Sequence, residues 1–105
     1  MAGADYEREL RDVLRRSGWV IFRSAGSHNA DLIALKPDDH QIIEVKSTKA
    51  DKFYTSSDKE QYDLMNAYAQ QGFNVYYYVR WKGRKPRWKR WKLPQKPYPV
   101  FRYGK

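Results

Sequence analysis

Two charged residues in one short apolar segment are the first candidates for chemistry. Glu44 and Lys46 lie in the segment from Gln41 to Ser47, whose composition predicts a β-strand. Because side chains alternate between the two faces of a strand, both point to the same face. An acid and a lysine placed this way also occur as an ordinary charge pair on a sheet, so the pair does not define a site by itself.

A second acid should lie near this pair in a hairpin. Asp31 opens the apolar segment Leu32–Leu35, and the turn-forming residues 36–40 join that segment to the strand that carries Glu44. Two neighbouring carboxylates repel, which raises the pKa of one of them, and a divalent cation removes that cost. With Lys46 alongside to polarise a water or stabilise a phosphorane, the set suits metal-dependent phosphodiester hydrolysis.

A third acid, Glu7, borders the apolar face of the first predicted helix. Tyr6, Leu10, Val13 and Leu14 form that face at helical spacing. Glu7 is therefore expected to point toward the sheet and to complete the set of carboxylates. The alternative is a carboxylate near the helix N-terminus that complements the helix dipole.

The elements that would position these residues follow from apolar periodicity and turn residues. Helices are expected over 4–17 and from Ser57 to Gly72, the second opened by a capping box of Ser57 and Glu60. Strands are expected at 19–22, 32–35, 41–47, 75–79 and 87–93. A polar loop is expected over 48–57 and an irregular chain over the last dozen residues. The order α-β-β-β-α-β-β predicts an α/β fold with a central mixed five-stranded sheet flanked by helices. The length fits one domain, residues 1–105, which includes the basic segment 80–105.

Charge is distributed unevenly along the chain, whose formal net charge is +9. Residues 1–63 hold 10 Lys and Arg and all 12 acids, whereas residues 64–105 hold 11 Lys and Arg and no acid. Trp residues are interleaved with cations from Trp81 to Lys92. Phosphates attract such cations and bases stack on exposed rings, so nucleic acid is the expected partner. The alternatives are a solvated basic strand whose Trp rings fill the core, and a membrane surface or an acidic protein as partner.

The residue types and motifs that are absent from the sequence exclude several kinds of site. It has no Cys and two His, which excludes disulfides, thiolate zinc sites and His-rich metal cages and leaves carboxylate ligands for hard ions. The longest apolar run, Val75–Val79, is far shorter than the roughly 20 residues of a membrane helix. No apolar signal core is present, so a cytoplasmic protein is expected. No G-x-x-x-x-G-K-[ST] loop occurs, so no nucleotide cofactor is expected.

Ordered motifs across residues 5–93 resemble the archaeal-type Holliday junction resolvases, nucleases of the restriction-endonuclease-like superfamily. The matching stretches are Glu7–Leu10, Gly18–Ser27, Ala30–Ala34 and Ile43–Ser47. A helix, a Gly turn and a strand that ends in Val79-Arg80 follow in the family order. Ala30 replaces the proline of many relatives, which shapes the turn and supplies no ligand. The chain also ends soon after the fifth expected strand, whereas relatives often carry more C-terminal residues.

This resemblance implies a metal site and its ligands. Asp31, Glu44 and Lys46 match the family pattern P-D-x(n)-(D/E)-x-K, and Glu7 corresponds to the glutamate of the first helix. Asp31, Glu44, Glu7 and the carbonyl of Val45 would hold one or two Mg²⁺ ions, with Mn²⁺ as a substitute. Lys46 would orient or activate the attacking water.

The resemblance also implies further site residues. A catalytic serine of the loop after the first strand corresponds to Ser27, with Ser24 as the alternative. The expected DNA-binding cations come from the first helix, the first strand and the basic segment. They are Arg8, Arg23, Arg80, Lys82, Arg84, Lys85, Arg87, Lys89 and Arg90.

The implied activity is that of a structure-selective, Mg²⁺-dependent endonuclease that resolves four-way DNA junctions by paired symmetric cuts as a homodimer. Two alternatives stay open: another nuclease of the superfamily acting on branched, nicked or single-stranded DNA, and a non-catalytic DNA-binding module. The dimer contact should use apolar surface. The helix face with Tyr62, Met65 and Tyr68 is one candidate, unless these residues pack on the protein's own sheet.

Overall fold

The computed structural model describes residues 2–24 and 30–104 and centres on a five-stranded sheet. Its order is β1-β2-β3-β5-β6. Only β3 and β5 are parallel among these strands, and the other neighbours are antiparallel. The predicted α/β class and mixed five-stranded sheet are confirmed. The strands are β1 (Val20–Arg23), β2 (Leu32–Lys36), β3 (Asp39–Thr48), β5 (Val75–Trp81) and β6 (Trp88–Leu93).

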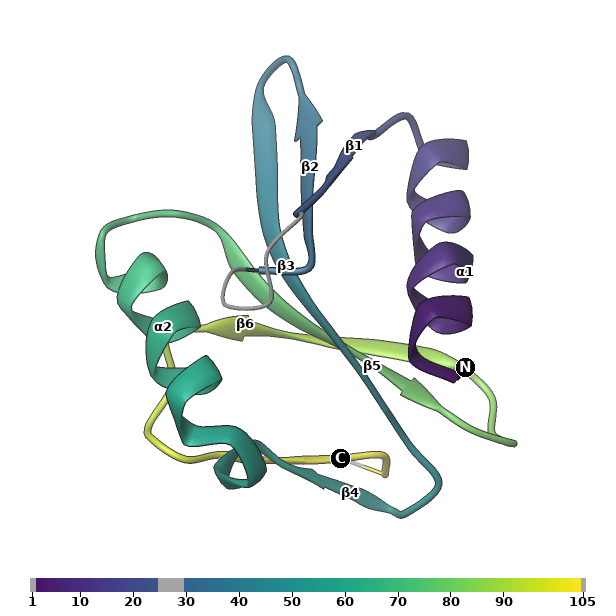
Figure 1. Cartoon of the computed structure of the whole chain (residues 1–105), viewed down its shortest axis with the longest axis vertical. Coiled ribbons are helices and arrows are strands. Elements are labelled where there is room, and N and C mark those ends of the chain that lie inside the picture. Colours follow the sequence, from purple (N-terminus) through teal and green to yellow (C-terminus); the bar gives the residue numbers. More distant parts are fainter. Residues whose placement is uncertain (1, 25–29, 105) are drawn as a thin grey trace.

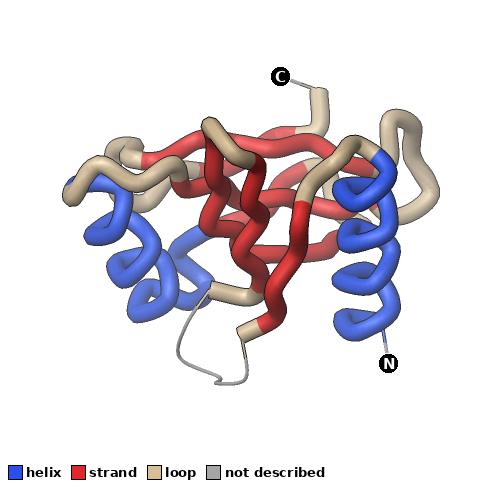
Figure 2. The backbone as a smooth tube through the Cα atoms, turned by 90° about the horizontal axis from the view of Figure 1, so that it is seen from above, coloured by secondary structure: helices blue, strands red, loops and turns tan. Residues whose placement is uncertain are grey.

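Two helices cover opposite faces of this sheet (Figures 1 and 2). On one face, α1 (Ala2–Arg16) packs Leu10 and Leu14 into a cluster with residues of β1, β2 and β3. On the other face, α2 (Lys59–Gln70) packs into a second cluster with β5, β6 and C-terminal residues. Because α2 is the crossover between β3 and β5, it makes these two strands parallel.

Both helices end at the glycines that the sequence suggests. Gly18 has a φ of +93° and Gly72 a φ of +104°. In α1 the N–H of Trp19 donates to the carbonyl of Leu14, and in α2 the N–H of Phe73 donates to the carbonyl of Tyr68. These are Schellman caps, whose left-handed residue favours glycine.

A second, two-stranded sheet lies where the sequence predicts loop and irregular chain. It pairs β4 (Lys52–Tyr54) antiparallel with β7 (Val100–Arg102), side by side at the lower end of Figure 1. The register joins Phe53 to Phe101, and the buried Phe101 ring stacks on Trp91 with 4.5 Å between centroids. Each strand has three residues, so its local pattern is too short to predict. The long-range burial of these rings determines the pairing.

The start of α2 differs from the prediction by one residue. A 3₁₀ turn, η1 (Thr55–Asp58), precedes the helix, and the N-cap is Asp58 rather than Ser57. The Asp58 carboxylate accepts a hydrogen bond from the backbone N–H of Gln61 at 3.1 Å. The Ser57 hydroxyl instead donates to the carbonyl of Tyr54. A carboxylate satisfies the same free N–H groups and also complements the helix dipole.

The apolar face of α2 belongs to the protein's own core. Tyr62 and Met65 are fully buried against the sheet, and Tyr68 packs beside them. The expectation that this helix face makes a dimer contact is therefore wrong for Tyr62 and Met65. No helix within the described ranges has the length and apolar character needed to span a membrane.

Candidate active site

The β2–β3 hairpin brings the two key carboxylates together. Its register pairs Leu32 with Ile43, which places Asp31 next to Glu44. The carboxylate of Asp31 accepts a hydrogen bond from the backbone N–H of Val45 at 2.8 Å. This bond holds Asp31, which directly precedes β2, against the middle of β3. The predicted proximity of Asp31 to Glu44 or its neighbour is therefore present.

Glu44 is buried, with 5% of its surface exposed. One carboxylate oxygen lies 3.3 Å from the ammonium of Lys46, and the other accepts a hydrogen bond from the side-chain amide of Gln61 at 2.9 Å. Burial, together with the nearby charge of Asp31, raises the pKa of Glu44 to about 7, although Lys46 and Gln61 act in the opposite direction. Glu44 and Lys46 lie on one face of β3, as the sequence predicts, and they form an ion pair there.

This arrangement favours a bound cation. The ionised form of Glu44 is unfavourable here because the carboxylate is desolvated and close to Asp31. The charge of a bound divalent ion would stabilise both carboxylates in their ionised form. Carboxylate oxygens are the ligands that Mg²⁺ prefers, and Mg²⁺ commonly binds through one or two carboxylates while keeping several waters. Asp31 and Glu44 therefore fit such an ion.

Glu7 has a different partner. Its carboxylate lies 3.3 Å from the guanidinium of Arg23, and this pair joins α1 to the end of β1. Arg8 pairs with Asp5 on the exposed side of α1. Among residues 2–24 and 30–104, no group of three or more His, Asp and Glu side chains lies close enough to hold a metal. The role of Glu7 as a ligand stays a prediction.

The loop that carries the predicted serine is only partly described. Ser27 lies outside the described residues. Ser24, the alternative, precedes that segment, and its backbone N–H donates to the carbonyl of Asp31 at 3.1 Å. Ala30, which replaces the family proline, is buried in the cluster under α2.

Gln61 is the site residue that sequence reasoning missed. It lies in the first turn of α2, where Asp58 caps the helix, and its amide reaches Glu44 on β3. The available signal was topological: a crossover helix that follows β3 must pack across the sheet beside that strand. The identity of the contacting side chain depends on the position of the cap, which was predicted one residue too early.

Most of the predicted DNA-binding cations of the basic segment contact acids or aromatic rings of the protein. Arg80 lies 3.1 Å from Glu9, Arg87 lies 3.8 Å from the same carboxylate, and Arg84 pairs with Asp51. Aromatic rings lie under five of these cations: Tyr6 under Arg80 and Lys82, Tyr103 under Arg84 and Lys89, and Tyr76 under Arg90. Lys85 is exposed at the turn between β5 and β6. Their role in DNA binding stays a prediction.

The Trp residues of this segment serve mainly as core. Trp81 is fully buried, and Trp91 packs partly buried against the same cluster. Trp88 is also partly buried, and its indole N–H points to Glu9 at 3.4 Å. The alternative reading of the rings as core is therefore correct for Trp81. Lys85, Arg87 and Arg90 are exposed, whereas none of these three indoles is.

Comparisons of the sequence with known proteins point to one family. The family model described as archaeal Holliday junction resolvase (Hjc) matches residues 1–96. A curated relative, the crossover junction endodeoxyribonuclease Hjc of Methanocaldococcus jannaschii, is 39% identical over 56 residues. That match covers 53% of this chain and 42% of the relative, so less than half of the relative's length is represented.

The solved structures support the same fold. The chain resembles the Holliday junction resolvase Hjc of Archaeoglobus fulgidus with a TM-score of 0.76 and 23% identity, over 96% of this chain and 82% of that one. The two carboxylates and the lysine of the site lie on the motif stretches that resemble the family, and the family match extends over nearly the whole chain. The chain therefore belongs to the archaeal Holliday junction resolvase (Hjc) family.

Proposed function

We propose that this protein is an Mg²⁺-dependent endonuclease that resolves four-way DNA junctions as a homodimer, with Mn²⁺ able to replace Mg²⁺. The observation that carries the proposal is the buried Glu44 next to Asp31 and Lys46, in a chain of this family. A buried acid with a raised pKa beside a second acid is unfavourable for folding, which is typical of a site that binds a cation.

Asp31 and Glu44 would hold the metal, with Glu7 and the carbonyl of Val45 as further ligands. When bound, the ion lowers the pKa of its water and neutralises charge on the scissile phosphate. Lys46 lies 3.3 Å from Glu44, so its ammonium can orient the attacking water or donate to a phosphate oxygen. Gln61 fixes the second oxygen of Glu44 and thereby its orientation. The products would be a 5′-phosphate and a 3′-hydroxyl.

The homodimer is supported by an apolar face on β1 and β2. Val20 is 57% exposed and Phe22 54% exposed, and they pair across the strands with Leu35 and Ile33, each 39% exposed. These four side chains therefore share one face of the sheet. A hollow of about 250 Å³ lies at its edge, lined by residues that include Ile33, Ile42 and Tyr68. Such contiguous apolar surface is typical of a protein–protein contact and does not suit DNA phosphates.

A second copy of this chain is the occupant that fits the proposed activity. Ile33 pairs with Ile42 on β3, and Ile42 and Glu44 point to the same sheet face. A two-fold contact through β1 and β2 would thus place an active site at each border of the interface. Two such sites match the two symmetric strands of a four-way junction. Because the family is described as archaeal, we also propose that this activity takes place in the cytoplasm.

Cleavage of a labelled four-way junction, compared with a linear duplex of the same sequence, tests the function. With Mg²⁺ we expect paired symmetric cuts in the junction alone, and no cuts in EDTA. Equal cutting of the duplex would replace junction resolution with a general nuclease activity. Tight junction binding without cuts, in Mg²⁺ and in Mn²⁺, would contradict the catalytic claim and leave a DNA-binding module.

A further inference from the structure

The small sheet of β4 and β7 places two cations side by side. Its register pairs Lys52 directly with Arg102, so both side chains point to the same face. Their strand neighbours Phe53 and Phe101 take the opposite face, where Phe101 is buried in the core. Lys52 and Arg102 therefore face outward. Like charges directly opposite each other on a strand pair are destabilising.

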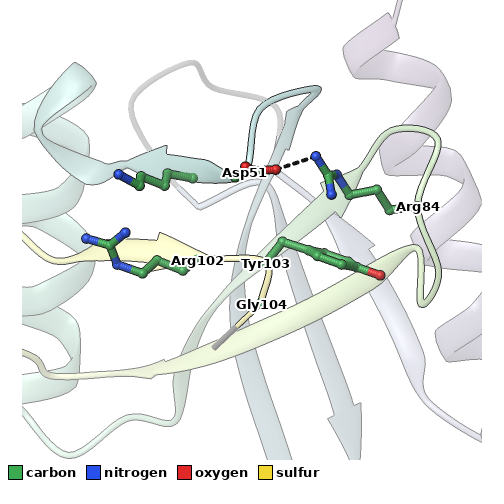
Figure 3. Close-up of a pocket in the computed structure, with 6 residues that line it drawn as sticks. Asp51, Arg84, Arg102, Tyr103 and Gly104 are labelled. Carbon is green, nitrogen blue, oxygen red and sulfur yellow. Dashed lines mark hydrogen bonds and ion pairs between the residues drawn. The ribbon is translucent and has the colours of Figure 1, made fainter.

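Neither cation has a counter-charge within the described part of the chain. Over residues 2–24 and 30–104, Lys52 and Arg102 form no ion pair and no side-chain hydrogen bond. The nearest acid in sequence is Asp51, and its carboxylate is bonded to Arg84 from the β5–β6 turn. Figure 3 shows this bond on one side, while Arg102 extends in the other direction. Asp51 is thus neutralised by a third cation, Arg84, and does not balance the charges of Lys52 and Arg102.

The two cations border a hollow of about 390 Å³ that Asp51, Arg84, Tyr103 and Gly104 complete (Figure 3). The Tyr103 ring forms a fixed wall. The guanidinium of Arg84 lies 5.0 Å from its centroid and the ammonium of Lys89 lies 4.6 Å from it, while its hydroxyl donates to the carbonyl of Lys85. The residues that line this hollow do not include Asp31, Glu44 or Lys46.

We propose that Lys52 and Arg102 form a phosphate clamp that binds the backbone of a DNA arm outside the active site. This inference rests on the proposed function and adds a part of the DNA surface beyond the basic hairpin. A phosphodiester between the two cations would replace their repulsion with two charge-assisted hydrogen bonds. A fully exposed anion such as DNA fits better than an apolar partner, because the outward face offers charge and a shallow hollow.

The test is the salt dependence of junction binding in EDTA, where no cleavage occurs. The variant is Lys52→Gln/Arg102→Gln. Its matched control is Arg15→Gln/Arg16→Gln, which removes the same charge from exposed positions in the last turn of α1. For the clamp variant we expect the slope of log K against log salt to fall by about 2, and affinity near 0.1 M salt to fall about 10- to 100-fold. The Arg102→Lys variant should keep most of the affinity.

Thermal melting separates binding from folding. Removing two like charges that face each other should leave the melting temperature of the DNA-free clamp variant unchanged or higher. An unchanged slope, or an equal loss in the control variant, would overturn the clamp while wild-type cleavage of the junction still stands. If the wild-type protein neither binds nor cuts a junction, the proposed function fails together with the clamp.

Discussion

Glu44 on β3 and Arg80 on β5 are both largely buried charges in the same sheet, yet their surroundings differ. Arg80 lies 3.1 Å from Glu9, which also contacts Trp88 and Arg87, so its charge is balanced within the protein. Glu44 has Lys46 on one side and the like charge of Asp31 on the other, and burial raises its pKa. A balanced buried charge serves the fold. The imbalance at Glu44 costs stability, and the proposed cation would offset that cost.

The largest effect should follow from removing the acid at the unbalanced site. Glu44→Gln keeps the shape of the side chain and removes a metal ligand. We expect cleavage of the four-way junction to fall by about 10³-fold or more, since the metal contributes several kcal/mol to the transition state. Single-turnover cleavage with protein in excess measures this loss. Junction binding in EDTA is the control and should persist; a variant that cuts at the wild-type rate would contradict the role of Glu44.

Stability should depend on pH through the same residue. A raised pKa means that the folded protein holds a proton that the unfolded chain releases, so stability is lost as pH rises from about 4.5 to about 7. The shift corresponds to about 3 kcal/mol for metal-free protein. Urea unfolding in EDTA at pH 5 and pH 8 measures it. Glu44→Gln should flatten this dependence and be the more stable protein at pH 8. An identical pH dependence in both proteins would show that the burial of Glu44 has no such cost.

Gln61 tests whether the orientation of Glu44 matters. Gln61→Leu removes the hydrogen bond to Glu44 and fills a similar volume. We expect cleavage to fall about tenfold, which corresponds to one lost hydrogen bond to a charged group. The pH profile of cleavage should also shift to higher pH, because this hydrogen bond lowers the pKa of Glu44. A rate loss without a shift of the pH profile would assign Gln61 to packing alone.

The smallest effects should separate the balanced charges from the free ones. Glu9→Gln leaves Arg80 without its acid, and we expect unfolding free energy to fall by about 1–3 kcal/mol. Lys85→Gln, at the exposed β5–β6 turn, should leave stability unchanged and lower junction affinity several-fold, with a salt slope smaller by about 1. Urea unfolding measures the stability of each variant, and salt-dependent binding measures the affinity of each for the junction. Destabilisation by Lys85→Gln, or none by Glu9→Gln, would break the distinction between the two kinds of cation.

The parts of the fold that depend on local patterns were predictable from the sequence. Strand alternation in the β2–β3 hairpin fixes the proximity of Asp31 and Glu44, and glycines mark both helix ends. Features that depend on contacts between residues far apart in the sequence were not predictable. Phe53 and Phe101 pair over a separation that no local pattern records, and Glu9 meets Arg80 between the first helix and β5. Gln61 was missed because its contact with Glu44 depends on the position of the helix cap, which was predicted one residue too early.

The predicted cation surface illustrates how charge counts differ from charge placement. The sequence shows a C-terminal part with 11 Lys and Arg and no acid, which indicates a polyanion as partner. It does not show that acids from the N-terminal part bind Arg80, Arg84 and Arg87. Nor does it place Lys52 beside Arg102, because that pair forms only when β4 meets β7.

The central claim is that Asp31 and Glu44 together bind a divalent cation, and thermal melting with and without Mg²⁺ tests it most directly. An ion that binds only the folded protein raises its melting temperature. At pH 8, where Glu44 is ionised, we predict that Mg²⁺ raises the melting temperature of the wild-type protein but not that of Glu44→Gln or Asp31→Asn. An equal rise in all three proteins would place the cation elsewhere and contradict the account.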